Sequence, residues 1–391
     1  MNRMHDHDWP EPDADAAAHS LRLVTRIREA MDSAGGEIPF ERFMDLALYA
    51  PGLGYYTAGA RKFGEAGDFI TAPEVSPLFG RCLARQCRDV FAELGGGAIL
   101  EVGAGSGAMA ASLLAELEAL GAMPEKYFIL DVSAELRARQ RETLTDRVPH
   151  LLDAVEWIDT PPERLRGVVL ANEVLDALPV ERFRVEENGF SREFVGWNEG
   201  FEPRWRPADE ALANELRELF ADRRVSPPYV SEFCRRLPAF IGTLSDALDA
   251  GLMLFIDYGY PRGEYYLPER NNGTLMCHYR HRAHADPFVY PGLQDITAYV
   301  DFTAVAAAGV DCGLELHGYT TQAQFLLGSG LYEMLPDIDP GDTVRSLKVS
   351  QEVQKLTMPG EMGDRFKVMG LDRGLERPVS GFSLKDLSPA L

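Results

Sequence analysis

One segment, residues 97–107, constrains the fold of this chain most strongly. It reads Gly-Ala-Ile-Leu-Glu-Val-Gly-Ala-Gly-Ser-Gly, and an alanine- and leucine-rich run over residues 108–120 follows it. The apolar run predicts a strand, the alternating glycines a tight turn that a ligand can approach closely, and the last run a helix. Strand, glycine turn and helix together indicate the first unit of a doubly wound α/β sheet, in which such a turn contacts a nucleotide-like ligand.

The acid that ends this strand indicates which ligand fits. Glu101 precedes the first of the three glycines, Gly103, Gly105 and Gly107. A carboxylate at this position repels a pyrophosphate and disfavours a dinucleotide-binding oxidoreductase. It suits a ligand that carries an ammonium and a sulfonium, such as S-adenosylmethionine. A Gly-x-Gly-x-Gly pattern is weak alone, and an ordinary turn is the alternative.

Further strands extend the predicted sheet. Tyr127–Leu130 is expected to be the second strand, and Asp131 at its end is placed to accept hydrogen bonds from ribose hydroxyls. The alternative role for Asp131 is to cap the next helix, but Ser133 can supply that cap. The remaining strands are expected at Val155–Ile158 and at residues 167–171, 252–256, 314–320 and 366–371.

The order of these segments predicts five regions. An insertion between the fourth and fifth strands alternates like a hairpin over residues 181–201, with a turn at Asn188-Gly189, and has helical patterns over residues 208–221 and 229–250. We expect a disordered tail (1–20), an N-terminal helical segment with a cofactor-covering loop (21–94), the first part of the Rossmann-like domain (95–180), the inserted subdomain (181–250), and the rest of the sheet with substrate-side loops (251–391).

Composition excludes several classes of function. The chain has 391 residues and a formal net charge of −22, which opposes binding to nucleic acid and to anionic membranes. No apolar stretch is long enough to span a bilayer, and the N-terminus lacks a targeting pattern, so we expect a cytoplasmic protein. His278, His281 and His284 recur at three-residue spacing, but no carboxylate or cysteine completes a ligand set. We therefore predict no metal site.

Two groups of polar residues follow the central strands. Asn172, Glu173 and Asp176 come after the fourth strand, where a doubly wound fold places its reaction centre. Carboxylates there can hold a guanidinium bidentately beside the methyl donor; the alternative is that they shape a turn and cap a helix. Asp257 and Tyr258 follow the fifth strand and either line the same crevice or form a strand-end turn.

Several short motifs occur together in the order of a known family. The chain resembles the MidA-type methyltransferases, a family that includes the mitochondrial complex I assembly methyltransferase. The likeness covers about residues 40–366 and rests on the glycine turn and on residues 67–76, 171–179, 257–259, 273–284, 294–302, 322–326 and 362–366. One departure is Asp131, where the family often has Glu.

This resemblance implies a class I methyltransferase sheet with an added subdomain, S-adenosylmethionine as cofactor, and a site assigned residue by residue. The implied cofactor-binding residues are Asp68, Thr71, Glu101, Gly103, Gly105, Gly107 and Asp131. The candidate substrate-binding residues are Glu74, Asp257, Tyr258, His281 and His284. Asn172, Glu173 and Asp176, which follow the fourth strand, are the candidate catalytic residues.

We expect an S-adenosylmethionine-dependent protein arginine methyltransferase. The mitochondrial relative modifies a respiratory NADH dehydrogenase subunit, so the resemblance implies a protein substrate, whose identity stays open here. The alternatives are a methyltransferase-like assembly factor that binds a partner with little turnover, and a small-molecule methyltransferase. We expect no nucleic-acid partner and no membrane insertion, and a homodimer is left open.

Overall fold

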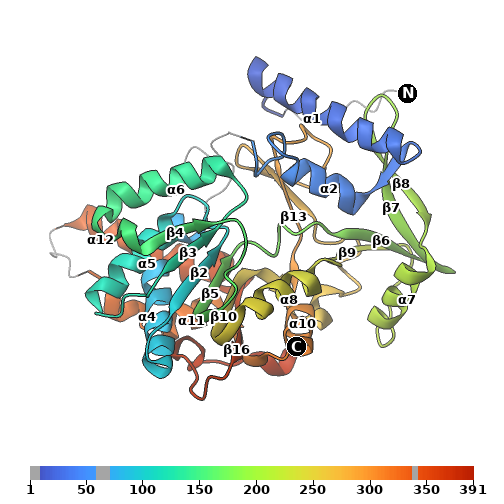
Figure 1. Ribbon diagram of the computed structural model, residues 1–391. Coiled ribbons are helices and arrows are strands. Elements are labelled where there is room, and N and C mark those ends of the chain that lie inside the picture. The colour runs from blue at the N-terminus through green and yellow to red at the C-terminus, as the bar shows by residue number, and fades with distance from the viewer. Residues whose placement is uncertain (1–8, 59–70, 337–341) are drawn as a thin grey trace.

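The structure is a computed structural model that describes residues 9–58, 71–336 and 342–391 (Figure 1). Asp68, predicted to bind the cofactor, lies outside the described residues, as does the first part of the loop over residues 67–76. Among the described residues, no helix has both the length and the apolar character needed to cross a membrane.

An eight-stranded sheet forms the centre of the molecule. Its strand order is β15-β16-β10-β5-β2-β3-β4, and β14 pairs with the end of β10. All pairings from β4 to β10 are parallel, whereas β16 runs antiparallel to both of its neighbours. The bounds are β2 Ala98–Val102, β3 Tyr127–Leu130, β4 Val155–Ile158, β5 Leu165–Asn172, β10 Leu248–Tyr260, β14 Val300–Asp301, β15 Glu315–Thr321 and β16 Phe366–Arg373.

This order confirms the predicted doubly wound sheet. From β2 the chain builds β3 and β4 on one side and then returns to β5 and β10 on the other. The switch between β2 and β5 leaves a crevice at their carboxyl ends, where ligands of such sheets bind. All seven predicted strands are present, with ends shifted by a few residues.

Helices cover both faces of the sheet because its central strands are apolar on both sides. Val168 and Leu170 of β5 face one core, while Val169 and Ala171 face the other, and all four are at most 1% exposed. The first core packs against α4 (Pro77–Leu94), α5 (Ala108–Ala119), α6 (Ala134–Arg147), α11 (Gln322–Gly328) and α13 (Met362–Arg365). The second packs against α8 (Leu237–Ala247) and α10 (Phe302–Asp311).

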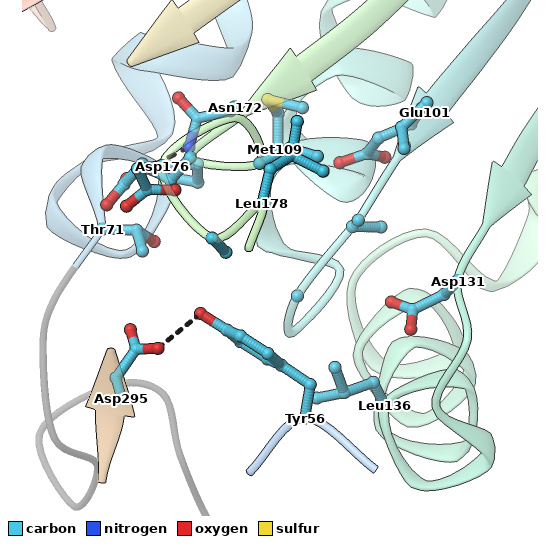
Figure 2. Close-up of a pocket in the computed structure, with 18 of the residues that line it drawn as sticks. Tyr56, Thr71, Glu101, Met109, Asp131, Leu136, Asn172, Asp176, Leu178 and Asp295 are labelled. Atoms are coloured by element: carbon cyan, nitrogen blue, oxygen red, sulfur yellow. Dashed lines mark hydrogen bonds between the residues drawn. The ribbon is translucent and has the colours of Figure 1, made fainter. Parts of the chain in front are cut away.

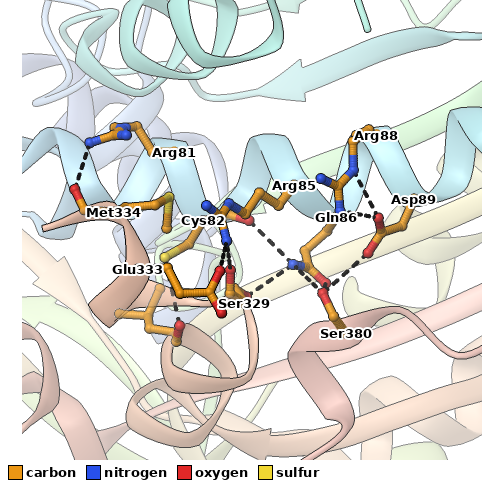
Figure 3. A network of polar contacts seen from close by, with 11 residues as sticks. Arg81, Cys82, Arg85, Gln86, Arg88, Asp89, Ser329, Glu333, Met334 and Ser380 are labelled. Carbon is orange, nitrogen blue, oxygen red and sulfur yellow. Dashed lines mark hydrogen bonds and ion pairs between the residues drawn. The ribbon is translucent and has the colours of Figure 1, made fainter. Parts of the chain in front are cut away.

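Polar contacts fasten the C-terminal part of the chain to α4 (Figure 3). The side chain of Gln86 is fully buried; its amide donates to the hydroxyls of Ser329 and Ser380 at 3.0 and 3.2 Å. Its carbonyl oxygen accepts from the backbone N–H of Gly381 at 2.8 Å. Gln86 therefore joins segments nearly 300 residues apart in sequence without leaving a buried amide unpaired.

A second, smaller unit stands beside the carboxyl edge of the central sheet (Figure 1). It has a sheet of order β1-β7-β6-β9, with β8 on β7, and a three-stranded sheet of order β12-β11-β13. The bounds are α1 Ala14–Ser33, β1 Glu37–Pro39, α2 Phe40–Tyr49, β6 Glu181–Glu186, β7 Gly189–Trp197, β8 Phe201–Pro207, α7 Glu210–Leu219, β9 Tyr229–Phe233, β11 Met276–Tyr279, β12 Arg282–His284 and β13 Asp295–Thr297. Residues of α1, α2, β7, β11 and β13 share one hydrophobic core.

The structure confirms the predicted hairpin and corrects its surroundings. Glu186 pairs with Gly189 across the expected turn. The helix predicted over residues 229–250 is wrong at its start, since residues 229–233 form strand β9, in which Tyr229 and Ser231 are fully buried against the neighbouring strand. The strand β8 was not predicted. Helix α1 begins at Ala14, so the chain is already helical before residue 20.

A buried ionic network connects the inserted sheet to the segment that follows β10. Arg182 on β6 donates to Glu193 at 2.6 Å and to Glu232 at 3.2 Å, and both carboxylates are fully buried. Glu232 also accepts from the backbone N–H of Thr274 at 2.7 Å. This contact fixes the start of the segment that carries β11 and β13. The remaining helices are α3 Ala72–Val75, α9 Arg262–Tyr265 and α12 Thr343–Thr357, with short 3₁₀ turns at Pro149–Ala154, Leu331–Met334, Ser380–Phe382 and Ser388–Ala390.

Candidate active site

A cavity of about 670 Å³ lies at the carboxyl edge of the central sheet, between it and the smaller unit (Figure 2). The side formed by the sheet contributes the glycine turn and the ends of β3 and β5, and the opposite side contributes residues of α2, β11 and β13. Most of the residues predicted to bind cofactor or acceptor line this cavity: Thr71, Glu101, Gly103, Gly105, Asp131, Asn172, Glu173, Asp176 and Tyr258.

Glu101 stands at the end of β2, and its side chain is held by Tyr127 on the neighbouring strand. The Tyr127 hydroxyl donates to the Glu101 carboxylate at 2.6 Å. Burial raises the pKa of Glu101 to about 7, and the hydrogen bond from Tyr127 opposes this rise. A cationic ligand group beside Glu101 would favour its ionised form.

The glycine turn divides into two functions. Gly103 and Gly105 have backbone φ values of 68° and 53°, which residues other than glycine rarely adopt, and both line the cavity. Gly107 does not line it. Gly107 is the N-cap of α5, and a Cβ there would lie 3.1 Å from the Cα of Gln140, so close packing on α6 explains this glycine.

Asp131 lies at the end of β3, on the side of the cavity away from β5 (Figure 2). Its carboxylate accepts from the backbone N–H of Ser133 at 2.9 Å and from the side-chain amide of Gln140 at 2.8 Å. Ser133 caps α6 by accepting from the N–H of Leu136, as the sequence predicted. The two donors orient the Asp131 carboxylate at the cavity wall, where Leu136 and Asp159–Pro161 supply the neighbouring surface.

Helix α3 lies between the glycine turn and helix α12 and contributes to the wall of the cavity. Thr71, its N-cap, lines the cavity. Glu74 does not line it: its carboxylate accepts a hydrogen bond from Ser106 in the glycine turn. Ser76 donates to Glu352 of α12 at 2.7 Å. The Ser106–Glu74 hydrogen bond therefore supports the glycine turn from outside the cavity.

The three predicted catalytic residues converge at the end of β5. Asn172 donates to the Glu173 carboxylate at 3.1 Å, and Glu173 has a φ of 54°, a conformation that costs a residue with a side chain about 1–3 kcal/mol. Burial raises the pKa of Glu173 to about 8, and the charge of Asp176 adds to the rise. Burial likewise raises the pKa of Asp176 to about 6, against a hydrogen bond from Tyr258.

Two buried oxygen atoms at this end of the cavity have no hydrogen-bond partner among the described residues. They are Oδ1 of Asn172 and Oδ1 of Asp176, and the residues are 9% and 4% exposed. An unpaired buried acceptor costs free energy, so this wall is suited to a ligand that brings N–H donors.

Asp257 and the histidines take different positions from those predicted. Asp257 is 1% exposed and does not line the cavity; it accepts from the backbone N–H groups of Leu175 and Asp176, which holds the turn after β5. His281 is exposed, and His284 packs on Trp9 with 4.3 Å between ring centroids. His278 lines the cavity instead. The described residues contain no group of three candidate ligands that could hold a metal ion.

Other cavity residues had not been assigned to the site from the sequence. Tyr49 and Tyr56 come from α2 and the turn after it, Asp295 from β13, Tyr299 from the segment before β14, and Arg365 from α13. Asp295 and Arg365 lie within motifs on which the family resemblance rests, and Tyr56 lies within an aromatic turn. The sequence shows these motifs but not that they meet at the cavity.

Residues 82–320 match the family described as "Putative S-adenosyl-L-methionine-dependent methyltransferase". The chain belongs to this methyltransferase family. A crystal structure from Burkholderia thailandensis, bound to S-adenosylhomocysteine, is 46% identical, covers 98% of this chain and 100% of its own, and superposes with a TM-score of 0.94.

Curated relatives of this methyltransferase are similar over nearly their whole length. The mitochondrial protein arginine methyltransferase NDUFAF7 of Danio rerio is 28% identical, with 90% of each chain covered. The Drosophila melanogaster homologue is 27% identical and covers 96% of this chain and 92% of its own. These matches and the Burkholderia structure confirm the MidA-type family, the fold, S-adenosylmethionine as cofactor and methyl transfer as the reaction class.

The residues present fit this cofactor. The cavity offers two carboxylates, Glu101 and Asp131, at the ends of adjacent strands, with a glycine turn between them that a ligand can approach closely. The carboxylates suit cationic and hydroxyl groups, and S-adenosylmethionine carries both. Neither carboxylate suits a phosphate. The chemistry of the wall therefore agrees with the family.

Proposed function

We propose that this methyltransferase modifies arginine side chains of a protein, with Glu173 and Asp176 holding the acceptor. The observation that carries the proposal is the pair of carboxylates at the end of β5, together with the unpaired Oδ1 atom of Asp176. A guanidinium brings five N–H donors in a planar fork and a permanent positive charge. It would satisfy the unpaired acceptor and offset part of the negative charge of the pair.

The same carboxylates can manage the proton that methylation releases. S-adenosylmethionine supplies a methyl group on a sulfonium sulfur. As one guanidinium nitrogen bonds to the methyl carbon, the methyl–sulfur bond breaks and that nitrogen loses a proton. Asp176, whose pKa is raised to about 6, is ionised near neutral pH and is placed to accept it. Glu173, whose pKa is raised to about 8, becomes able to accept a proton as the pH rises.

The acceptor is a protein in this proposal because the curated relatives that match nearly full length are named protein arginine methyltransferases. The resemblance noted above makes a respiratory NADH dehydrogenase subunit the first candidate. We place the reaction in the cytoplasm, since the cysteines of the chain are scattered and free, in keeping with a reducing compartment.

The test combines transfer of labelled methyl with site variants. Purified full-length protein is incubated with labelled S-adenosylmethionine and proteins from cells that lack this chain, and modified residues are located by mass spectrometry. We expect methylarginine. Glu173→Gln and Asp176→Asn should each lower kcat/KM by about 100-fold or more, which corresponds to about 2.7 kcal/mol.

The control for these variants is Asp249→Asn, at the opposite end of β10, where the carboxylate pairs with Arg164 on the surface. It should retain activity within about twofold, because surface ion pairs contribute little. All three variants should bind S-adenosylhomocysteine like the parent protein. Label found only on lysine or on small molecules would contradict the arginine proposal.

A further inference from the structure

A third carboxylate faces the acceptor end of the cavity from the smaller unit. Asp295 on β13 is 2% exposed and lines the cavity. The Tyr56 hydroxyl donates to its Oδ1 at 2.9 Å. Figure 2 shows this pair across the cavity from Asn172 and Asp176. Neither Asp295 nor Tyr56 has a role in the cofactor site described above.

The charges of these groups influence one another across the cavity. The pKa of the Tyr56 hydroxyl is raised well above its ordinary value by burial, then by the charges of Asp295 and Asp176. The charge of Asp295 also contributes to the raised pKa of Glu173. Carboxylates from two separate units therefore line one cavity and influence one another there.

Several contacts fix the positions of Asp295 and Tyr56. The Oδ1 atom of Asp295 also accepts from the backbone N–H of Ile296 at 2.9 Å, and Ile296 is fully buried in the core of the smaller unit. The Tyr56 ring stacks on Tyr49 at 5.6 Å, and the Tyr49 hydroxyl donates to the backbone carbonyl of Ala177 at 3.0 Å. Tyr49 thus connects Tyr56 to the turn that carries Asp176.

We propose that Asp295, oriented by Tyr56, is the second arm of a guanidinium subsite whose first arm is Asp176, and that this pair of arms selects a guanidinium over an ammonium acceptor. A planar guanidinium can donate along two edges to carboxylates on opposite sides, whereas an ammonium is a compact point charge that cannot span them in one plane. The inference rests on the proposed function, and it assigns acceptor selectivity to the smaller unit.

The test measures binding of two small cations to the full-length protein loaded with S-adenosylhomocysteine. The probes are n-butylguanidinium and n-butylammonium, which have the same charge and the same apolar tail, and binding is followed by calorimetry. The parent protein should prefer the guanidinium. In Asp295→Asn, affinity for n-butylguanidinium should fall about 10- to 100-fold, the effect expected for a lost charged hydrogen-bonding partner, while S-adenosylhomocysteine affinity stays within about twofold.

Tyr56→Phe tests the orienting contact separately. Its ring can still stack on Tyr49, but the donor to Asp295 is lost, so we expect a smaller loss of about 3- to 10-fold in guanidinium affinity. The matched controls are Asp249→Asn, at the far end of β10, and Tyr332→Phe, at a residue that is 63% exposed. Both should bind n-butylguanidinium like the parent. In Asp295→Glu, the restored charge should return part of the lost affinity.

The outcomes separate this inference from the proposed function. If the parent protein binds S-adenosylhomocysteine but shows no preference for n-butylguanidinium, the arginine acceptor and the subsite are both wrong. If the parent shows the preference and Asp295→Asn keeps it, the acceptor proposal stands and the assignment of Asp295 is overturned. A loss in Asp295→Asn that n-butylammonium shares to the same extent would also overturn it, because the carboxylate would then supply charge without selecting shape.

Discussion

Removing the hydroxyl of Tyr127 should weaken cofactor binding in a way that depends on pH. In the parent protein this hydroxyl donates at 2.6 Å to Glu101, whose pKa burial raises to about 7. The hydrogen bond lowers that pKa because it stabilises the ionised carboxylate. Tyr127→Phe deletes the donor and leaves the ring, which is fully buried, in place.

The expected magnitude follows from this one contact. A hydrogen bond to a charged group contributes about 1.5–3 kcal/mol, and 1.36 kcal/mol corresponds to one pKa unit, so the Glu101 pKa should rise by about 1–2 in the variant. At pH 7 Glu101 is about half ionised in the parent and about 1–10% ionised in the variant. If the cofactor binds the ionised form, affinity at pH 7 falls about 5- to 50-fold.

The assay is calorimetric titration with S-adenosylhomocysteine at pH values from 6 to 9. The ratio of the two dissociation constants at each pH cancels the titration of the ligand itself. This ratio should shrink to about twofold or less at pH 9, where Glu101 is ionised in both proteins. A deficit that is the same at every pH, or no deficit at pH 7, would refute the role given to Glu101.

Tyr319→Phe is the matched control for this substitution. Tyr319 is 1% exposed, lies on β15, and its hydroxyl has no hydrogen-bond partner among the described residues. Its removal should leave both cofactor affinity and its pH dependence unchanged. Thermal unfolding of both variants checks that the fold is retained.

Two further predictions concern other parts of the molecule. Gln86→Leu should lower the free energy of unfolding by about 2–4 kcal/mol, since it leaves the buried N–H of Gly381 unpaired and removes a hydrogen bond from each of the Ser329 and Ser380 hydroxyls, which keep their bonds to the Phe325 carbonyl and to Asp89. Denaturant titration measures this change, and cofactor affinity per folded molecule should not change. With saturating cofactor, kcat/KM for the acceptor should rise from pH 6 to pH 8.5. Asp176 and Glu173, whose pKa values are about 6 and about 8, bind the cationic acceptor when they are ionised. A profile that falls over this range would contradict that role.

The cofactor half of the site could be predicted from the sequence because it is local. Glu101, Gly103 and Gly105 lie within five residues of one another, and Asp131 follows the next strand, so the strand–turn–helix pattern fixes their positions. The same pattern could not separate Gly105 from Gly107, since both glycines have positive φ. Their difference depends on Gln140 of another helix, which packs on Gly107.

The errors came from segments whose structure depends on distant partners. Residues 229–233 have a sequence that fits a helix or a strand, and pairing with β6 decides the outcome. Asp257 was placed near the crevice from its position at a strand end, which is correct for the backbone. Its side chain turns to the N–H groups of Leu175 and Asp176, a contact that local sequence does not reveal.

The acceptor half of the site is assembled from segments about 240 residues apart, and this explains why the sequence could not assign it. Tyr56 and Asp295 form one contact, although one follows α2 and the other begins β13. Their meeting requires the smaller unit to form its own core, which includes residues of α2 and β13. That unit also depends on the Arg182 network, which fixes the segment before β11. Acceptor selectivity should therefore fail when this unit is perturbed, while the glycine turn and Asp131, built on the central sheet alone, keep their affinity for the cofactor.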